Sequence, residues 1–254
     1  MKASRQFGLQ SFCLRHFKDN AVVAAKVRGL GLDRIELCRI HAELDVVDSV
    51  REAARNYADA GIAIVSLGVQ VFHGESGEKG VFESAAAIGA KHISAALRVD
   101  SYLRAIPRLR EWSREFGVRV GLHCHGGASF GGQPEVLTYL IGLGQPEVGL
   151  CLDTAWAMQI GPQKGNPVAW ARQFAGAITA VHYKDFVFGA DASWKDVPVG
   201  SGTLDLPAFV QALDEGGFDG VAILEYEAEP ENPEPMLREC VARMRTALEQ
   251  PENS

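Results

Sequence analysis

Short apolar runs alternate with longer amphipathic runs along the chain. Eight of the short runs are apolar at nearly every position rather than at every second one. Strands of this kind are buried on both faces, as in a parallel sheet that helices cover. The pattern therefore predicts eight parallel strands. They span residues 7–12, 34–38, 62–69, 92–97, 118–124, 148–153, 178–185 and 221–227.

The segments between these runs have the spacing of amphipathic helices. The clearest are 19–30, 47–60, 101–116, 206–215 and 234–248. Several end in glycine, as at Gly61 and Gly117, which favours a left-handed C-cap before the next strand. Eight strand–helix units at a spacing of about 32 residues predict a closed (β/α)8 barrel.

No linker, low-complexity tract or block of charge divides the sequence, so we expect a single domain over residues 1–254. A doubly wound open sheet is the alternative for the same alternation of elements. The turn after the first strand lacks the GxGxxG pattern of that fold, and eight even units favour closure.

Composition and charge narrow the class of partner. The net charge is −7, whereas nucleic-acid binders cluster Lys and Arg to neutralise phosphates, so we expect no nucleic acid. No apolar run approaches the ~20 residues that span a bilayer, so we expect no membrane insertion. The first residues lead directly into a strand, without a secretory leader, and the five cysteines form no CxxC pair. A cytoplasmic location is expected.

The carboxyl ends of barrel strands point into the active site. The last four predicted strands bring His123, Asp153, His182 and Glu225 to that end. A single strand histidine is more often a core residue, and Asp153 could simply cap the next helix. Glu225, however, closes an apolar run, where a carboxylate needs compensation. Together the four predict one divalent metal site, with Mn²⁺ first and Zn²⁺, Co²⁺, Fe²⁺ or Mg²⁺ as alternatives.

Further short segments stand in a characteristic order and spacing. They are 8–15 (GLQSFCLR), 35–37 (IEL), 81–83 (VFE), 90–91 (AK), 123–127 (HCHGG), 152–154 (LDT), 181–185 (VHYKD), 197–202 (VPVGSG) and Glu225. On these segments the chain resembles the xylose isomerase-like TIM barrels, the superfamily of sugar phosphate isomerases/epimerases and endonuclease IV. The resemblance covers nearly the whole length and implies a metal-dependent enzyme acting on a small sugar-like substrate.

The resemblance also implies a ligand set, with two departures. Members typically bind one ion through a strand-five carboxylate and residues matching Asp153, His182 and Glu225. This chain has His123 where many members have Glu, and it resembles a branch with His-x-His-Gly on strand five. Trp156 follows where a Gly-His pair is common after the strand-six Asp. His123 is therefore either a ligand or a substitute base, because a metal-bound nitrogen has lost its lone pair.

The resemblance implies isomerase- or epimerase-like chemistry: a base removes the proton alpha to a carbonyl, and the metal stabilises the enediolate. The alternative is a lyase or dehydratase that eliminates from a 3-keto-glycoside or keto-inositol and needs only one carboxylate base. The expected catalytic residues are Glu225 as ligand and possible base, with His125 and Lys184 as proton donors. Candidate substrate-binding residues are Arg15, Glu36, His73 and Trp156.

Other classes fit the sequence less well. An endonuclease IV-type enzyme needs a multi-zinc cluster and a basic face, which seven histidines and the net charge of −7 disfavour. A Ser/His/Asp hydrolase lacks its GxSxG elbow. A non-catalytic metal-binding barrel remains the alternative of another class. A homo-oligomer is possible in each case.

Overall fold

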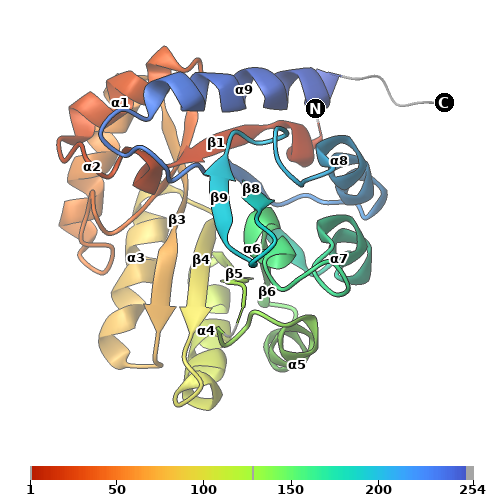
Figure 1. Cartoon of the computed structure of the whole chain (residues 1–254). Helices are drawn as coiled ribbons and strands as arrows, with labels where there is room; N and C mark the ends of the chain where they lie inside the picture. Colours follow the sequence, from red (N-terminus) through yellow and green to blue (C-terminus); the bar gives the residue numbers. More distant parts are fainter. Residues whose placement is uncertain (1, 128, 250–254) are drawn as a thin grey trace.

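Within residues 2–127 and 129–249, which the computed structural model describes, eight parallel strands close into a barrel (Figure 1). The order around the barrel is β1-β10-β7-β6-β5-β4-β3-β2, so barrel strands adjacent in sequence are adjacent in space. The predicted (β/α)8 fold is confirmed. The strands are β1 (Phe7–Gln10), β2 (Arg34–Leu37), β3 (Ala63–Phe72), β4 (His92–Leu97), β5 (Arg119–His123), β6 (Val148–Asp153), β7 (Ile178–Tyr183) and β10 (Val221–Leu224).

Helices surround the barrel (Figure 1). Gly89 and Gly117 end two of them with positive φ angles of 77° and 64°, as the expected C-caps require. The α-helices are α1 (Asn20–Gly29), α2 (Val47–Asp59), α3 (Lys79–Ile88), α4 (Tyr102–Phe116), α5 (Pro134–Gly144), α6 (Thr154–Met158), α7 (Pro167–Gln173), α8 (Leu206–Glu215) and α9 (Glu234–Glu249). Short 3-10 turns are η1 (Ala3–Arg5), η2 (Ser11–Leu14) and η3 (Ser76–Glu78).

The seventh barrel strand ends earlier than predicted. It stops at Tyr183, and Asp185 begins an antiparallel hairpin of β8 (Asp185–Phe188) and β9 (Trp194–Val197), which the sequence pattern did not reveal. The Asp185 carboxylate accepts hydrogen bonds from four backbone N–H groups of residues 200–204, at 2.9–3.0 Å. These bonds fold the following loop back against the start of the hairpin. The chain thus changes direction within the run that the sequence pattern assigned to one strand, between β7 and β8.

Burial explains why the strands read as continuous apolar runs. Every residue of β6 and β7 is buried, because one face lines the barrel interior and the other packs against helices. The five cysteines are buried free thiols. Within residues 2–127 and 129–249, none of the helices has the length and apolar character needed to cross a membrane.

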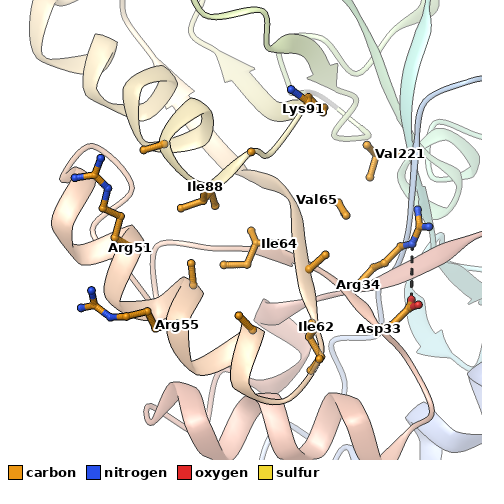
Figure 2. A pocket seen from close by; sticks show the side chains of 16 residues that line it. Asp33, Arg34, Arg51, Arg55, Ile62, Ile64, Val65, Ile88, Lys91 and Val221 are labelled. Carbon is orange, nitrogen blue, oxygen red and sulfur yellow. Dashed lines mark ion pairs between the residues drawn. The ribbon is translucent and has the colours of Figure 1, made fainter.

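A hollow of about 1050 Å³ lies at the amino-terminal ends of the strands (Figure 2). Ile62, Ile64 and Ile88 form part of its apolar floor, and Arg51 and Arg55 extend from α2 at its edge. In barrels of this type the chemistry takes place at the opposite, carboxyl ends of the strands. This hollow is therefore separate from the metal-capable residues.

Candidate metal centre

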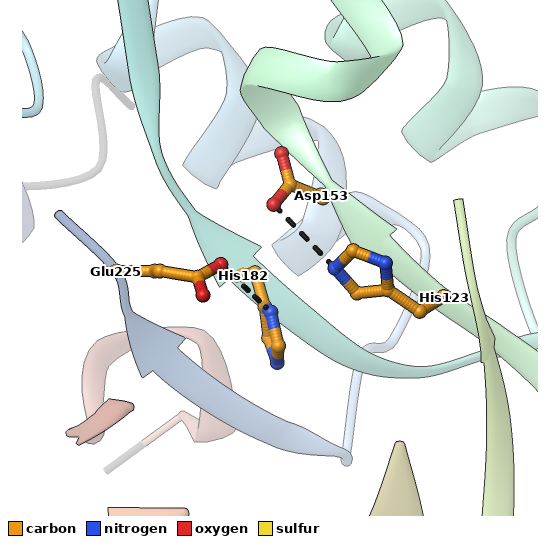
Figure 3. A group of neighbouring side chains, drawn as sticks. All are labelled: His123, Asp153, His182 and Glu225. Carbon is orange, nitrogen blue, oxygen red and sulfur yellow. Dashed lines mark hydrogen bonds and ion pairs between the residues drawn. The ribbon is translucent and has the colours of Figure 1, made fainter. Parts of the chain in front are cut away.

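Four consecutive positions around the barrel bring together two imidazoles and two carboxylates (Figure 3). His123 ends β5, Asp153 ends β6, His182 lies in β7, and Glu225 follows β10. The strand register aligns Asp153 with His182, so both side chains reach the same level of the barrel mouth. One ligand atom from each residue lies within 4.8 Å of all the others. The structure thus brings together the four residues predicted as ligands.

The group is buried and closely spaced. Asp153 and His182 are completely buried, while Glu225 and His123 are 6% and 9% exposed. His123 Nε2 lies 3.5 Å from Asp153 Oδ2, and His182 Nδ1 lies 3.2 Å from Glu225 Oε2. Two carboxylates in such surroundings require positive charge nearby.

The two oxygens of Asp153 have different surroundings. Oδ1 accepts a hydrogen bond of 2.8 Å from the backbone N–H of Trp156 and so caps helix α6. Oδ2 is buried and has no hydrogen-bond partner among the described residues, as is also true of His123 Nε2. Capping and metal binding are therefore compatible in this residue. The cap holds the carboxylate so that its second oxygen faces the cluster.

These unpartnered atoms indicate that the site fits a divalent cation. A buried polar atom without a partner is costly, and a cation would satisfy both atoms at once. Mixed imidazole and carboxylate donors suit Mn²⁺, Fe²⁺, Co²⁺ or Zn²⁺. His123, Asp153, His182 and Glu225 are the residues that would hold it.

Glu36 lies behind the cluster, at the end of β2. It is completely buried, and its Oε1 is 3.0 Å from His182 Nε2. Gln10, Ser66 and Ser94 donate hydrogen bonds to the same carboxylate. This position supports a role in holding the His182 ring rather than in contacting substrate.

A second charged group adjoins the cluster. Lys184, 1% exposed, forms an ion pair with Glu227, and its Nζ lies 3.8 Å from Glu225 Oε2. Burial acts to raise the pKa of Glu225, but Lys184 and His182 outweigh it and hold that pKa well below its usual value. Asp196 Oδ2, from the hairpin, accepts the backbone N–H of Glu227 at 2.7 Å. Lys184 thus compensates carboxylate charge behind the site.

A cavity of about 720 Å³ opens above the cluster, at the carboxyl ends of the strands. His123, His125, Trp156 and Glu225 line it. The rings of His125 and Trp156 stack with their centroids 4.2 Å apart. Desolvation, followed by repulsion from His123, lowers the pKa of His125, so its ring is neutral near pH 7 and can accept a proton.

Three residues expected to bind substrate do not line this cavity in the part of the chain that the structure describes. One is Glu36. Arg15 donates hydrogen bonds to the backbone carbonyls of Glu227 and Phe12, and it thereby ties two loops together. His73 Nδ1 lies 3.4 Å from Ser101 Oγ at the start of α4. Trp156 is the member of the predicted set that lines the cavity.

Sequence reasoning missed several cavity residues. Glu227 lines the cavity two positions beyond Glu225, and strand alternation would have placed both on one face. Gln10, Arg39 and Arg98 also line it, from the ends of β1, β2 and β4. They stand singly in their segments, so the pattern gave no reason to group them.

The chain belongs to the Xylose isomerase-like TIM barrel family, whose pattern it matches over residues 24–247. Among solved structures, it is similar to a xylose isomerase-like TIM barrel protein from Mycobacterium smegmatis in complex with magnesium. The TM-score is 0.79 at 15% identity, covering 98% of each chain. A 3-keto-D-glucoside 4-epimerase from E. coli gives a TM-score of 0.72 at 17% identity, covering 95% of this chain and 99% of that one. These likenesses show the fold.

Curated relatives are similar over part of the chain. The rhizopine catabolism protein MocC of Rhizobium meliloti is 30% identical over 167 residues, which is 58% of this chain and 50% of the relative. An inosose dehydratase of Lacticaseibacillus casei is 25% identical over 145 residues, 51% of this chain and 47% of the relative. The chain thus spans about half the length of the curated relatives it matches.

Proposed function

We propose that this chain is a divalent-metal-dependent enzyme that removes the proton next to the carbonyl of a keto-sugar or keto-cyclitol. The observation that carries the proposal is the buried set of two imidazoles and two carboxylates at the base of a cavity. A bound ion would act there as a Lewis acid toward a carbonyl and its neighbouring hydroxyl. The family membership and the relatives named inosose dehydratase and 3-keto-D-glucoside 4-epimerase support this substrate class.

The proton-transfer groups we propose face the cavity beside the four ligands. His125 is neutral near pH 7 and able to accept a proton, and Glu227 supplies a carboxylate. Glu225 remains a candidate base in addition to its role as ligand. Lys184 is buried behind Glu225 and Glu227, which supports a role in charge compensation rather than direct proton donation.

Elimination is the reaction that this arrangement supports best. A base takes the alpha proton, the C–H electron pair forms a C=C bond, and the beta oxygen leaves after receiving a proton. This reaction needs one base and one acid. The strand-five position holds His123 instead of a carboxylate, and the relative named inosose dehydratase supports the same assignment.

Isomerisation or epimerisation is the second candidate. It starts with the same removal of the alpha proton but returns a proton to carbon or oxygen without loss of a group. Glu227 favours this alternative, because it adds a second carboxylate to the cavity beside Glu225. Solvent deuterium in recovered keto substrate or its isomer would indicate this reaction, and an unsaturated product would indicate elimination.

The test is metal content together with proton exchange. We expect about one transition-metal ion per purified chain, lost in His182→Ala and Glu225→Ala but retained in the exposed control His16→Ala. The loaded protein should exchange the alpha proton of inosose or of a 3-keto-glucoside in D₂O. Protein that takes up no ion from added Mn²⁺, Co²⁺ or Zn²⁺ would contradict the proposal. Bound ion with neither exchange nor an unsaturated product would instead support a non-catalytic metal-binding barrel.

A further inference from the structure

The cavity above the metal-capable cluster has two unlike halves. The half formed by β5, β6, β7 and β10 carries the imidazoles and carboxylates. The half formed by β1 to β4, which are contiguous in the barrel, presents mainly apolar side chains. We call six of these residues the apolar wall. They are Phe12, Ile40, Val69, Val71, Leu97 and Val99.

The apolar wall extends from the barrel mouth out to the rim. Leu97 is 9% exposed, whereas Ile40 and Val99, which follow β2 and β4, are 37% and 67% exposed. Single exposed apolar residues are common on protein surfaces. Here they continue an apolar surface that lines a cavity, and such contiguous surfaces mark binding sites.

The two arginines on this side of the cavity are offset by acidic residues. Arg39 donates a hydrogen bond of 2.9 Å to Gln70 and forms an ion pair of 3.0 Å with Asp45. Arg98 and Asp100, which bear opposite charges, both line the cavity, so the two charges offset each other in the net charge of this half. The local charge therefore does not favour a phosphate group at the apolar wall. The hydroxyls of a bare sugar would also lose hydrogen bonds to water against it.

We propose that the substrate carries an apolar aryl or alkyl substituent that packs on the apolar wall while the keto ring faces the metal-capable cluster. The inference rests on the proposed function and narrows its substrate class to glycosides or ethers with an apolar group. The cavity of about 720 Å³ is several times larger than a single sugar ring and falls in the range of sites for larger ligands. His123 and Glu225 line the same cavity as the wall, so one ligand can contact both.

The experiment measures the affinity of Mn²⁺-loaded protein for methyl and for phenyl 3-keto-β-D-glucoside by isothermal titration calorimetry. We expect the phenyl compound to bind about tenfold or more tightly, because the ring buries additional apolar surface. Val99→Asn should remove most of this difference. Val99 is exposed, so the substitution should not impair folding. Val22→Asn, at an exposed valine of α1 outside the cavity, is the matched control.

Each other outcome overturns the inference in a distinguishable way. Equal binding of both glycosides, or equal effects of Val99→Asn and Val22→Asn, would refute the apolar wall but leave the proposed function standing. Tighter binding of the 6-phosphate of the methyl compound would assign the cavity to a sugar phosphate instead. A change of oligomeric state in Val99→Asn, seen by sedimentation, would assign the rim to a second copy. If neither glycoside bound, the inference would fall, and the proposed function would be decided separately by metal content and by alpha-proton exchange of inosose.

Discussion

Replacing Glu36 by glutamine is expected to weaken divalent-metal binding by about 10- to 100-fold. Glu36 Oε1 lies 3.0 Å from His182 Nε2, while Nδ1 of the same ring faces Glu225. A metal-binding imidazole typically donates its other N–H to a carboxylate, which fixes its tautomer and orientation. Glutamine has nearly the same size but no negative charge. The ring would therefore lose the negative charge beside Nε2 without a cavity being created.

The magnitude follows from the surroundings of Glu36. Burial acts to raise its pKa, but His182 and a hydrogen bond from Ser66 lower that pKa to about 2, so the carboxylate is charged at neutral pH. Hydrogen bonds to charged groups contribute about 1.5–3 kcal/mol. A 10- to 100-fold loss of affinity corresponds to about 1.4–2.7 kcal/mol, which agrees with this range.

The assay is calorimetric titration of Mn²⁺ into the metal-free protein, with thermal unfolding measured in parallel. Ser94→Ala is the matched control, because it removes one hydrogen bond to Glu36 and leaves the carboxylate beside His182. We expect less than a tenfold effect in this control. A folded Glu36→Gln protein that binds Mn²⁺ as tightly as the wild type would refute the reasoning.

Three further predictions concern stability. Burial raises the pKa of Asp196 to about 7. The folded state therefore holds this proton more tightly than the unfolded state does. The stability that the protonated group contributes is lost as the pH rises from about 4 to 7. This loss in the free energy of unfolding is at most about 4 kcal/mol, and Asp196→Asn should abolish it. Curves of unfolding free energy against pH that superimpose for the variant and the wild type would contradict the prediction. Lys184→Met should destabilise the metal-free protein by about 3–5 kcal/mol, because two carboxylates lose their cation; an unchanged denaturation midpoint would argue against this. Gly149→Ala should destabilise the protein by more than about 2 kcal/mol, since the new Cβ would lie 2.1 Å from a backbone oxygen. The control Gly142→Ala, in a helix, places its Cβ where no such atom lies within 4 Å and should not destabilise. Equal denaturation midpoints for the two variants would contradict this prediction.

The order of elements could be predicted from the sequence because it depends on local patterns. Continuous apolar runs mark strands buried on both faces, and glycines mark the ends of helices. The short β8–β9 hairpin escaped prediction because its first residue, Asp185, continues an apolar run. The strand ends before Asp185 because its carboxylate accepts hydrogen bonds from backbone N–H groups of a loop about 15 residues later in the chain.

The candidate metal ligands could also be predicted, since their positions follow from topology. Parallel strands in a barrel all end at the same mouth, so a polar residue at the end of a buried strand must lie there. Asp153 and Glu225 were therefore recognisable as departures from apolar runs. Their joint arrangement with His123 and His182 is consistent with that expectation.

The sequence by itself thus indicated the barrel, its order of strands and the four candidate metal ligands at its mouth. Only the tertiary structure decided whether each side chain is buried behind the cluster or faces the cavity. It separates Glu36, which is buried against His182, from Glu227, which faces the cavity, although both follow similar apolar runs. It also assembles an apolar wall from four separate strand ends. The physical reason is that contacts across a barrel depend on register and side-chain packing between distant segments, which no local pattern records.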